Sequence, residues 1–361
     1  MLLRMSMTLS FIPKKLFKAS ALPVTCLFLP CLICPAIAQT YQIQGFSDDY
    51  DAVIKPINDE DSEANSVINI IDTKTKKILI SQPADIDIDY ELDNGQKRQL
   101  GKKISANIVS IPYGEHSVLI YEDFNFDGQK DLALKDGRNG CYGGPSYQVY
   151  LKKGATFAHS EAFTELAQGY CGFFDVDEDS QTLSTMTKSG AAWHQYSKYK
   201  VIDNKPVAVH IIEEKYNDRG LVSITEKTEV NGKMLVENYE MLPPTDHSEE
   251  NEISSFVYRF DLENGKKMVL DSNYSNDTDG EQLFYVFADK RGRVELFYDG
   301  RFDYDASTQT LSFINKPVRY QINQKGITVK LSNKTTLLKS QSRSEHGSLD
   351  NLAQFKNVRI R

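Results

Sequence analysis

Oxygen-bearing side chains alternate along one short stretch of the chain, YEDFNFDGQKDL, and their spacing suits a hard metal ion. Four of them fall at positions 1, 3, 5 and 9 of a loop: Asp123, Asn125, Asp127 and Asp131. Calcium takes about six to eight oxygen ligands, and a glycine at position 6 allows the sharp turn that aims alternate side chains at one centre. Gly128 holds that position, and the backbone carbonyl of Gln129 follows it as a further ligand. The pattern predicts a calcium site.

The flanks of this loop are typical of strands and not of the helices of an EF-hand. Leu134 stands at position 12, where an EF-hand needs a bidentate glutamate. Residues 118–121 before the loop and 132–134 after it are short apolar runs of the kind that form buried strands. We expect the loop to join two strands, with Asp131 closing the metal site. A plain Asp, Asn and Gly turn in an acidic protein is the alternative.

The next segment, residues 140–147 with the sequence GCYGGPSY, contains three glycines, a proline and two tyrosines. This composition is typical of a loop and argues against a helix or a regular strand. A glycine-rich loop brings its backbone close to a partner, and tyrosine is favoured at protein interfaces. The segment is therefore either a partner-binding loop or a wide turn whose tyrosines fold back on the core.

The first 38 residues have the features of a cleaved export signal. A basic region is followed by a 14-residue apolar run at 21–34, and Ala36-Ile37-Ala38 matches an A-x-A cleavage site. We expect the mature chain to begin at Gln39, to be periplasmic or secreted, and not to insert into a membrane. A membrane anchor is the alternative, although the apolar run is short for a span and contains prolines.

Removal of this segment leaves a strongly acidic chain. The segment holds four of the 42 basic residues and none of the 50 acidic ones, so the mature chain carries a net charge of −12. That charge repels phosphate backbones and anionic lipids, which argues against nucleic acid and membrane surfaces as partners. It suits a cationic protein partner, because opposite fields speed encounter.

Two cysteines remain after the predicted cleavage, Cys141 and Cys171. An even number of cysteines in an oxidising compartment favours a disulfide, here one that ties the glycine-rich loop to residues 169–172. Such a bond would stiffen the loop before it meets a partner, which lowers the entropy lost on binding. Two unpaired buried thiols are the alternative.

The runs DFNFDGQKDLAL, GCYGGPSYQVYL, FFDVDEDSQTL and KSGAAWHQY resemble a family of bacterial envelope proteins. Proteins of that family are calcium-binding, propeller-like inhibitors of lysozyme-like peptidoglycan hydrolases. One type is the immunity protein to a lysozyme-like effector of a type IV secretion system. The resemblance covers about residues 41–240 and is most specific at 121–151. It implies that the four oxygen ligands above bind calcium in a loop similar to those of integrin-type propeller repeats.

The resemblance also implies that the loop after the metal site plugs the active site of a hydrolase. The segment of this chain that matches the plugging loop runs from Gly143 to Tyr147. We expect the partner contacts to be Tyr142, Gly143, Gly144, Ser146 and Tyr147. Cys141 stands where a small residue is expected. The implied partner is therefore a lysozyme-like peptidoglycan hydrolase, and the implied cofactor is Ca²⁺.

The whole chain reads as all-β, because aromatic and β-branched residues alternate with frequent turn signals. We expect a propeller-like antiparallel domain at 39–242, a polar proline-containing linker at 243–252, and a smaller β barrel or sandwich at 253–361. Residues 161–166 predict a short helix. Asn231-Gly232 predicts a tight hairpin, since this dipeptide is a strong two-residue turn signal.

A second acidic run contains Asp175, Asp177 and Asp179, but no glycine stands where the first loop has one. We expect a strand ending in an acidic turn there in preference to a second ion. The chain has no nucleophile elbow, zinc motif or phosphate loop, so we expect an inhibitor and not an enzyme. The alternatives are a calcium-stabilised cell-wall or carbohydrate-binding envelope protein, and a hydrolase that uses unassigned carboxylates.

Overall fold

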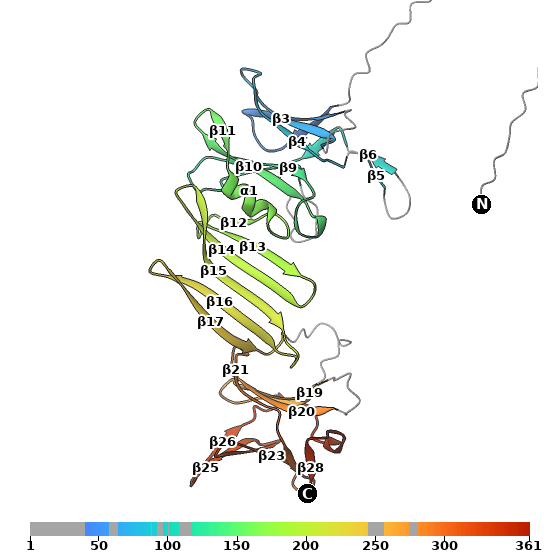
Figure 1. Ribbon diagram of the computed structural model, residues 1–361, viewed down its shortest axis with the longest axis vertical. Coiled ribbons are helices and arrows are strands. Elements are labelled where there is room, and N and C mark those ends of the chain that lie inside the picture. Colours follow the sequence, from blue (N-terminus) through green and yellow to red (C-terminus); the bar gives the residue numbers. More distant parts are fainter. Residues whose placement is uncertain are drawn as a thin grey trace, which may run out of the picture. The chain divides into compact units, whose positions relative to one another are not determined.

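Strands dominate every described part of the chain. The computed structural model describes residues 40–57, 64–87, 89–91, 97–99, 101–107, 117–244, 256–273 and 281–361 (Figure 1). The predicted all-β class is confirmed: within these residues the strands form mostly antiparallel sheets, and helical segments are short. The predicted leader and most of the predicted linker, from residue 245 on, lie outside the described residues. None of the described helices is long and apolar enough to span a bilayer.

Two sheets pack against each other at the start of the fold. The first has the strand order β4-β3-β2-β1-β7: β1 (Tyr41–Gln44), β2 (Tyr50–Pro56), β3 (Ser66–Asp72), β4 (Ile78–Ala84) and β7 (Lys103–Ser105). The second has the order β11-β10-β9-β8: β8 (Leu119–Glu122), β9 (Asp131–Gly137), β10 (Ser146–Lys153) and β11 (Thr156–His159). A separate pair joins β5 (Asp89–Glu91) to β6 (Lys97–Gln99).

The four-stranded sheet is covered on both faces. Leu132 and Leu134 of β9 belong to the hydrophobic cluster shared with the first sheet, whereas Ala133 between them belongs to a different cluster. Successive strand residues point to opposite faces, so an all-apolar run such as this one is what a doubly covered strand requires. The predicted strands on either side of the acidic loop are confirmed.

A helix and a six-stranded antiparallel sheet cover the second face. The helix α1 (Glu161–Gln168) is the predicted one, and Phe163 places its ring in the same cluster as Leu183 and Tyr199 of the large sheet. The strands of that sheet follow in chain order: β12 (Asp175–Asp177), β13 (Thr182–Ser189), β14 (Trp193–Ile202), β15 (Lys205–Tyr216), β16 (Val222–Val230) and β17 (Lys233–Met241). The Asn231-Gly232 hairpin between β16 and β17 is confirmed.

Residues 256–361 form two further sheets. One has the order β21-β20-β19-β18-β27: β18 (Phe256–Asp261), β19 (Lys267–Asn273), β20 (Gln282–Ala288), β21 (Val294–Tyr298) and β27 (His346–Gly347). The other has the order β26-β25-β24-β23-β22-β28: β22 (Phe302–Asp305), β23 (Thr310–Asn315), β24 (Val318–Asn323), β25 (Gly326–Leu331), β26 (Lys334–Lys339) and β28 (Val358–Ile360). A short helical turn, η2 (Leu352–Gln354), precedes β28.

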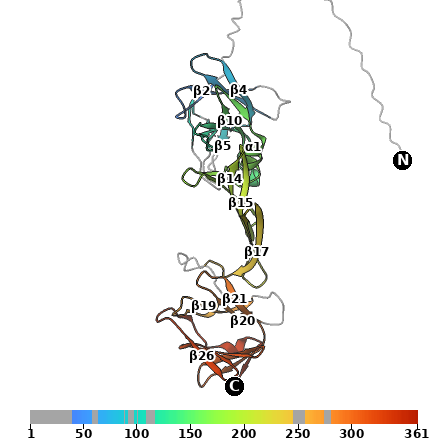
Figure 2. The ribbon, with the colours of Figure 1, turned by 90° about the vertical axis from the view of Figure 1, so that its left-hand side faces the viewer.

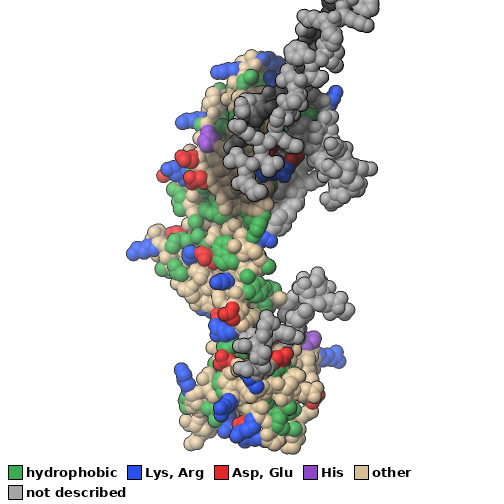
Figure 3. All heavy atoms as spheres, turned by 45° about the vertical axis from the view of Figure 1, so that its right-hand side comes forward, with side chains coloured by type: hydrophobic (Ala, Val, Ile, Leu, Met, Phe, Trp, Pro, Cys, Tyr) green, Lys and Arg blue, Asp and Glu red, His purple; other side chains and the backbone are tan. Residues whose placement is uncertain are grey.

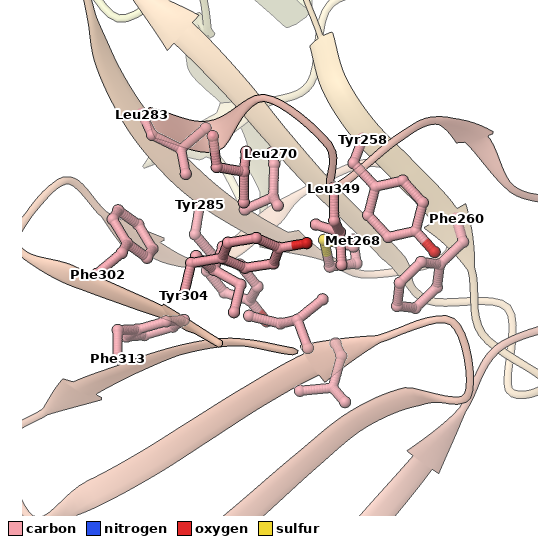
Figure 4. Packing of buried hydrophobic residues seen from close by; sticks show 14 of the residues in the cluster. Tyr258, Phe260, Met268, Leu270, Leu283, Tyr285, Phe302, Tyr304, Phe313 and Leu349 are labelled. Atoms are coloured by element: carbon pink, nitrogen blue, oxygen red, sulfur yellow. The ribbon is translucent and has the colours of Figure 1, made fainter. Parts of the chain in front are cut away.

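One core holds these two sheets together. Tyr285 of β20 and Phe302 and Phe313 of the second sheet pack in a cluster with Met268 and Leu270 of β19 (Figure 4). Side chains from two facing sheets that share one core make a sandwich. Between the predicted alternatives of barrel and sandwich, the sandwich is therefore the one observed.

All the described sheets are open. Each ends in edge strands, and none closes into a barrel within the described residues. The propeller-like arrangement is not confirmed and stays a prediction, as does the domain boundary at 243–252.

Candidate metal loop and tyrosine loop

The acidic loop spans the turn between β8 and β9, and a phenylalanine anchors it. Phe124, at the second loop position, is fully buried and packs edge-on against Phe173 and Phe174 with ring centroids 5.4 and 5.3 Å apart. Phe126 and Gly128 both have left-handed backbones, with φ of 60° and 83°. These two residues coil the chain between the anchored start of the loop and β9.

Carboxylates of the loop accept hydrogen bonds from its own backbone. Asp123 Oδ1 accepts from the N–H of Asp127 at 3.1 Å, and its Oδ2 accepts from the N–H of Gly128 at 2.7 Å. Asp127 Oδ1 accepts from the N–H of Gln129 at 2.8 Å. Asn125 makes a side-chain bond to Asp127 and another to Asn204, on the β14–β15 turn. Hydrogen bonds within the acidic loop therefore hold its backbone around Asp123 and Asp127 without the help of an ion.

Asp131 is the one carboxylate of the loop that is fully buried. Its Oδ2 accepts from the N–H of Phe124 at 2.9 Å, and its Oδ1 accepts from the N–H of Lys152 at 2.7 Å. The pKa of Asp131 is raised to about 7, mainly by burial and also by the negative charges of Asp123 and Asp127, against the lowering effect of those two hydrogen bonds. None of the described Lys, Arg or His side chains forms an ion pair with it.

The donor set fits a hard cation. Every side chain at the four predicted positions offers oxygen, which is the ligand calcium prefers. A buried carboxylate whose ionisation is opposed by burial and by two like charges is stabilised by a nearby positive ion. The described side chains do not, however, bring three or more His, Cys, Asp or Glu groups around one point. Asp123, Asn125, Asp127 and Asp131 would hold the ion with the Gln129 carbonyl, and Ca²⁺ stays a prediction.

The shifted pKa of Asp131 has a consequence for stability without metal. A carboxyl whose pKa is higher in the folded than in the unfolded chain stabilises the fold most when protonated, and this contribution is lost as pH rises through the folded pKa. In the presence of a chelator, we expect the melting temperature to fall because of Asp131 as pH rises from the unfolded pKa of 3.8 to the folded pKa of about 7. Thermal melts of wild type and Asp131→Asn test this, and equal slopes would refute it.

The predicted disulfide is present. Cys141 and Cys171 are bonded with their Cα atoms 4.6 Å apart, across 30 residues of sequence. The N–H of Cys171 also donates to the carbonyl of Met186 on β13, at 2.8 Å. The bond therefore fixes the glycine-rich loop to a segment that is itself tied to the six-stranded sheet.

Tyr142 forms the exposed tip of the glycine-rich loop. It lies in the helical turn η1 (Cys141–Gly143) with a left-handed φ of 55°, and 65% of its surface is exposed. Its hydroxyl oxygen accepts a hydrogen bond of 2.6 Å from the N–H of Gly190, on the β13–β14 turn. Lys188 Nζ lies 5.7 Å from the ring centroid. The ring is thus held in place at one end while most of its surface faces solvent.

Glycine is required where this loop closes on itself. The N–H of Gly140 donates to the carbonyl of Gly144 at 3.0 Å, across the η1 turn. A Cβ at Gly140 would lie 2.6 Å from the carbonyl oxygen of Pro145, too close for any other residue. Gly143, with φ of 74°, supplies the left-handed backbone that brings the chain back.

Two of the predicted partner contacts are wrong. Ser146 and Tyr147 are the first residues of β10 and are both fully buried. Both faces of β10 are covered: Tyr147 packs with Val149 in the cluster shared with α1 and the six-stranded sheet, and Ser146 lies on the other face, beside a register shift in the β9–β10 ladder. Ser146 Oγ donates to Asp136 Oδ1 at 2.5 Å, and Tyr147 Oη donates to the Ser117 carbonyl at 2.9 Å. The alternative of a tyrosine folded back on the core is the correct one for Tyr147.

Residues that sequence reasoning did not select continue the surface around Tyr142. Lys188, near the Tyr142 ring, lies directly opposite His194 in the β13–β14 ladder. The His194 ring stacks on Tyr196, which is 44% exposed. The run KSGAAWHQY contains all three, yet only the strand register shows that they share one face.

An open cavity of about 510 Å³ lies beside Tyr196. It is lined by strands β12 to β14 and the segment before them, through Phe173, Asp175, Ser184, Thr185, Met186, Tyr196, Ser197 and Lys198. Its walls combine aromatic and apolar surface with one acidic and one basic side chain. Such a mixture accepts a side chain of a protein partner or a small polar ligand.

The second acidic run forms the predicted turn. Asp175 and Asp177 belong to β12, and Asp177 Oδ1 accepts from the N–H of Ser180 at 2.9 Å. The hydrogen bond from the Ser180 hydroxyl lowers the pKa of Asp177, and this backbone hydrogen bond lowers it further. A turn that uses its aspartate as a hydrogen-bond acceptor needs no ion to explain it.

No family model matches the chain, and no curated protein matches it. Among solved structures, a type IV secretion system related protein from Xanthomonas is similar at 20% identity and a TM-score of 0.41, over 56% of this chain and 94% of that one. An uncharacterised protein from Listeria monocytogenes is similar at 8% identity and a TM-score of 0.22, over 84% of this chain and 85% of that one.

Proposed function

We propose that this protein is a periplasmic inhibitor that binds and blocks a lysozyme-like peptidoglycan hydrolase. The observation that carries the proposal is Tyr142, an aromatic side chain that is largely exposed and yet held at both ends. The Cys141–Cys171 disulfide fixes its backbone, and the Gly190 N–H fixes its hydroxyl. An aromatic ring already ordered before binding loses little entropy in a complex, which is what a plug for an active-site cleft requires.

The surroundings of Tyr142 support a protein partner. Tyr196 and His194 extend an aromatic surface next to the tip, and Lys188 lies between them and Tyr142. Hydrophobic side chains are exposed on the six-stranded sheet beside charged ones, and Figure 3 shows such green side chains next to blue and red ones. Tyrosine at the centre of a mixed surface is typical of the residues that dominate binding energy.

Charge supports a cationic partner. A mature chain of net charge −12 attracts a basic hydrolase and repels the anionic polymers of the envelope. The disulfide is typical of an oxidising compartment such as the periplasm, where peptidoglycan hydrolases act.

Calcium has a supporting role in the proposal. Bound to Asp123, Asn125, Asp127 and Asp131, it would neutralise the acidic coil and hold the start of β9. From β9 the chain runs directly into the glycine-rich loop. The ion would therefore order the segment from which Tyr142 projects, without touching the partner.

Truncation of the tip should weaken inhibition. Tyr142→Ala removes the exposed ring, and loss of such an aromatic anchor costs about 2 kcal/mol, or roughly thirty-fold in the inhibition constant. The measurement is peptidoglycan lysis by a panel of lysozyme-like hydrolases titrated with the purified protein. Leu337→Ala, at another exposed apolar residue, on β26, is the control and should inhibit as well as wild type.

The same assay decides against the proposal if wild-type protein inhibits no hydrolase of the panel, or if Tyr142→Ala and Leu337→Ala inhibit equally. The second candidate function is a calcium-stabilised, carbohydrate-binding envelope protein, which the cavity beside Tyr196 favours. Calorimetric binding of peptidoglycan fragments, lost in Tyr196→Ala, would support that function. Lysis of peptidoglycan by the protein alone would show an enzyme.

A further inference from the structure

The last strand of the six-stranded sheet is an open edge. Strand β17 pairs with β16 along its whole length, over nine residue pairs and without a bulge. On its outer side the only pairing among the described residues is a single bridge from Met241, at the end of the strand, to Arg293. Figure 2 shows β17 at the margin of the sheet. A long, regular and unpaired edge is a template for another strand.

Apolar side chains are exposed on both faces of this edge. Met234, Leu235 and Val236 are 40%, 57% and 57% exposed. They alternate across the strand, with Leu235 on one face and the other two on the opposite face. Natural edges are commonly protected by proline, by bulges or by charges, and the run 234–236 of β17 has none of these, with charges only on either side of it at Lys233 and Glu237.

The hairpin determines which backbone groups face outwards. Val230 and Lys233 close a two-residue turn, with left-handed backbones at Asn231 and Gly232, and such a closing pair exchanges both hydrogen bonds. Alternation along the ladder then turns the N–H and C=O of Met234 and Val236 away from β16. An added strand must therefore bond to these even-numbered residues.

We propose that β17 pairs antiparallel with β17 of a second copy of this chain, with Leu235 on the two-fold axis. In this register Met234 of one copy lies opposite Val236 of the other, so the outward backbone groups meet as hydrogen-bonded pairs. Lys233 of each copy then lies opposite Glu237 of the other. When two copies of the run Lys-Met-Leu-Val-Glu lie antiparallel, the positive end of each faces the negative end of the other. This complementarity identifies a second copy of the chain as the strand that pairs with β17.

Neighbouring registers lack this complementarity. The backbone bonds are kept only if the partner strand shifts by two residues at a time. A shift of two residues sets Lys233 opposite Leu235 in one direction and opposite Tyr239 in the other. A shift of four residues in the second direction sets Glu237 opposite Glu237 of the partner copy. Glu237 already bonds to Arg293 of its own chain, at 2.5 Å, and the side chain is 58% exposed, so a second cation has access to it. By contrast, β26 has lysine at both ends, and its reversed self-pairing would set lysine against lysine.

Charge exchange tests the contact. We expect the exported, purified chain to be a dimer by sedimentation at micromolar concentration. Lys233→Glu and Glu237→Lys should each weaken self-association at least tenfold, because both place like charges opposite each other twice. Mixing these two variants should restore a heterodimer, since both pairs are then complementary. A monomeric wild type, or a mixture no tighter than the separate variants, would overturn the proposal.

A cysteine pair tests the register. Residues opposite each other at a non-hydrogen-bonded position have Cα atoms about 4.5 Å apart, within disulfide range. Leu235→Cys should therefore cross-link two chains under mild oxidation. Val236→Cys, one residue along and equally exposed, should cross-link far less, because its counterpart is offset. Cross-linking at residue 236 in preference to residue 235 would refute this pairing. Val236→Pro removes an N–H that points away from β16, so it should weaken the dimer, and a dimer unaffected by it would also refute the pairing.

Discussion

The Cys141→Ser, Cys171→Ser double variant is expected to lower the free energy of unfolding by about 3 to 4 kcal/mol. The disulfide closes a loop of 30 residues and so restricts the unfolded chain. Without the disulfide the unfolded chain has more conformational entropy, which stabilises it by this amount in the chain-entropy account. Chemical denaturation of both proteins at equal pH measures the difference. A reductant should destabilise wild type to the level of the variant and leave the variant unchanged.

The same variant should lose inhibition beyond its loss of stability. Tyr142 stands next to Cys141, and its left-handed backbone is held by the closed η1 turn. Without the disulfide, the remaining ties of the loop are single hydrogen bonds, such as that from the Cys141 N–H to the Tyr170 carbonyl. Inhibition measured well below the melting temperature separates the two effects. A variant within about 1 kcal/mol of wild type would contradict the prediction for stability.

Removal of calcium is expected to have the next largest effect. An ion that binds only the folded chain stabilises it by about 2.7 kcal/mol at one hundred times its dissociation constant. A chelator should therefore lower the melting temperature of wild type by several degrees, and added calcium should restore it. Asp127→Ala should abolish this calcium-dependent shift, because it removes a predicted ligand that also caps the Gln129 N–H.

Asp179→Ala is the matched control for the calcium prediction. Asp179 belongs to the other acidic run, on the turn after β12, so its loss should leave the calcium-dependent shift unchanged. Magnesium at the same concentration should stabilise less, because it needs a more regular octahedral site. If neither chelator nor added calcium changes the melting temperature of wild type, the acidic loop between β8 and β9 is a turn that binds no metal.

Local chemistry made several features predictable from sequence. The glycine at position 6 and the apolar runs on either side were enough to place the acidic loop between two strands. Asn231-Gly232 identified its hairpin because the turn demands two left-handed backbones, which the structure has at 53° and 77°. The Cys141–Cys171 bond followed from an even count in an exported chain.

Features that depend on strand register were not predictable. Tyr147 is buried because α1 and the six-stranded sheet cover the face of β10 on which it lies with Val149, and no local pattern indicates that packing. Likewise Tyr196, His194 and Lys188 share a face through the β13–β14 pairing. Side chains on paired strands meet through contacts distant in sequence, so their assembly is a property of the sheet.

The position of β9 in the middle of three layers has a mechanical consequence. Its residues belong alternately to two different cores, and the acidic loop enters it at one end. If β9 unpairs, both cores lose packing contacts at once. The layers should therefore behave as one cooperative block, in which a disturbance of the loop is shared by both interiors.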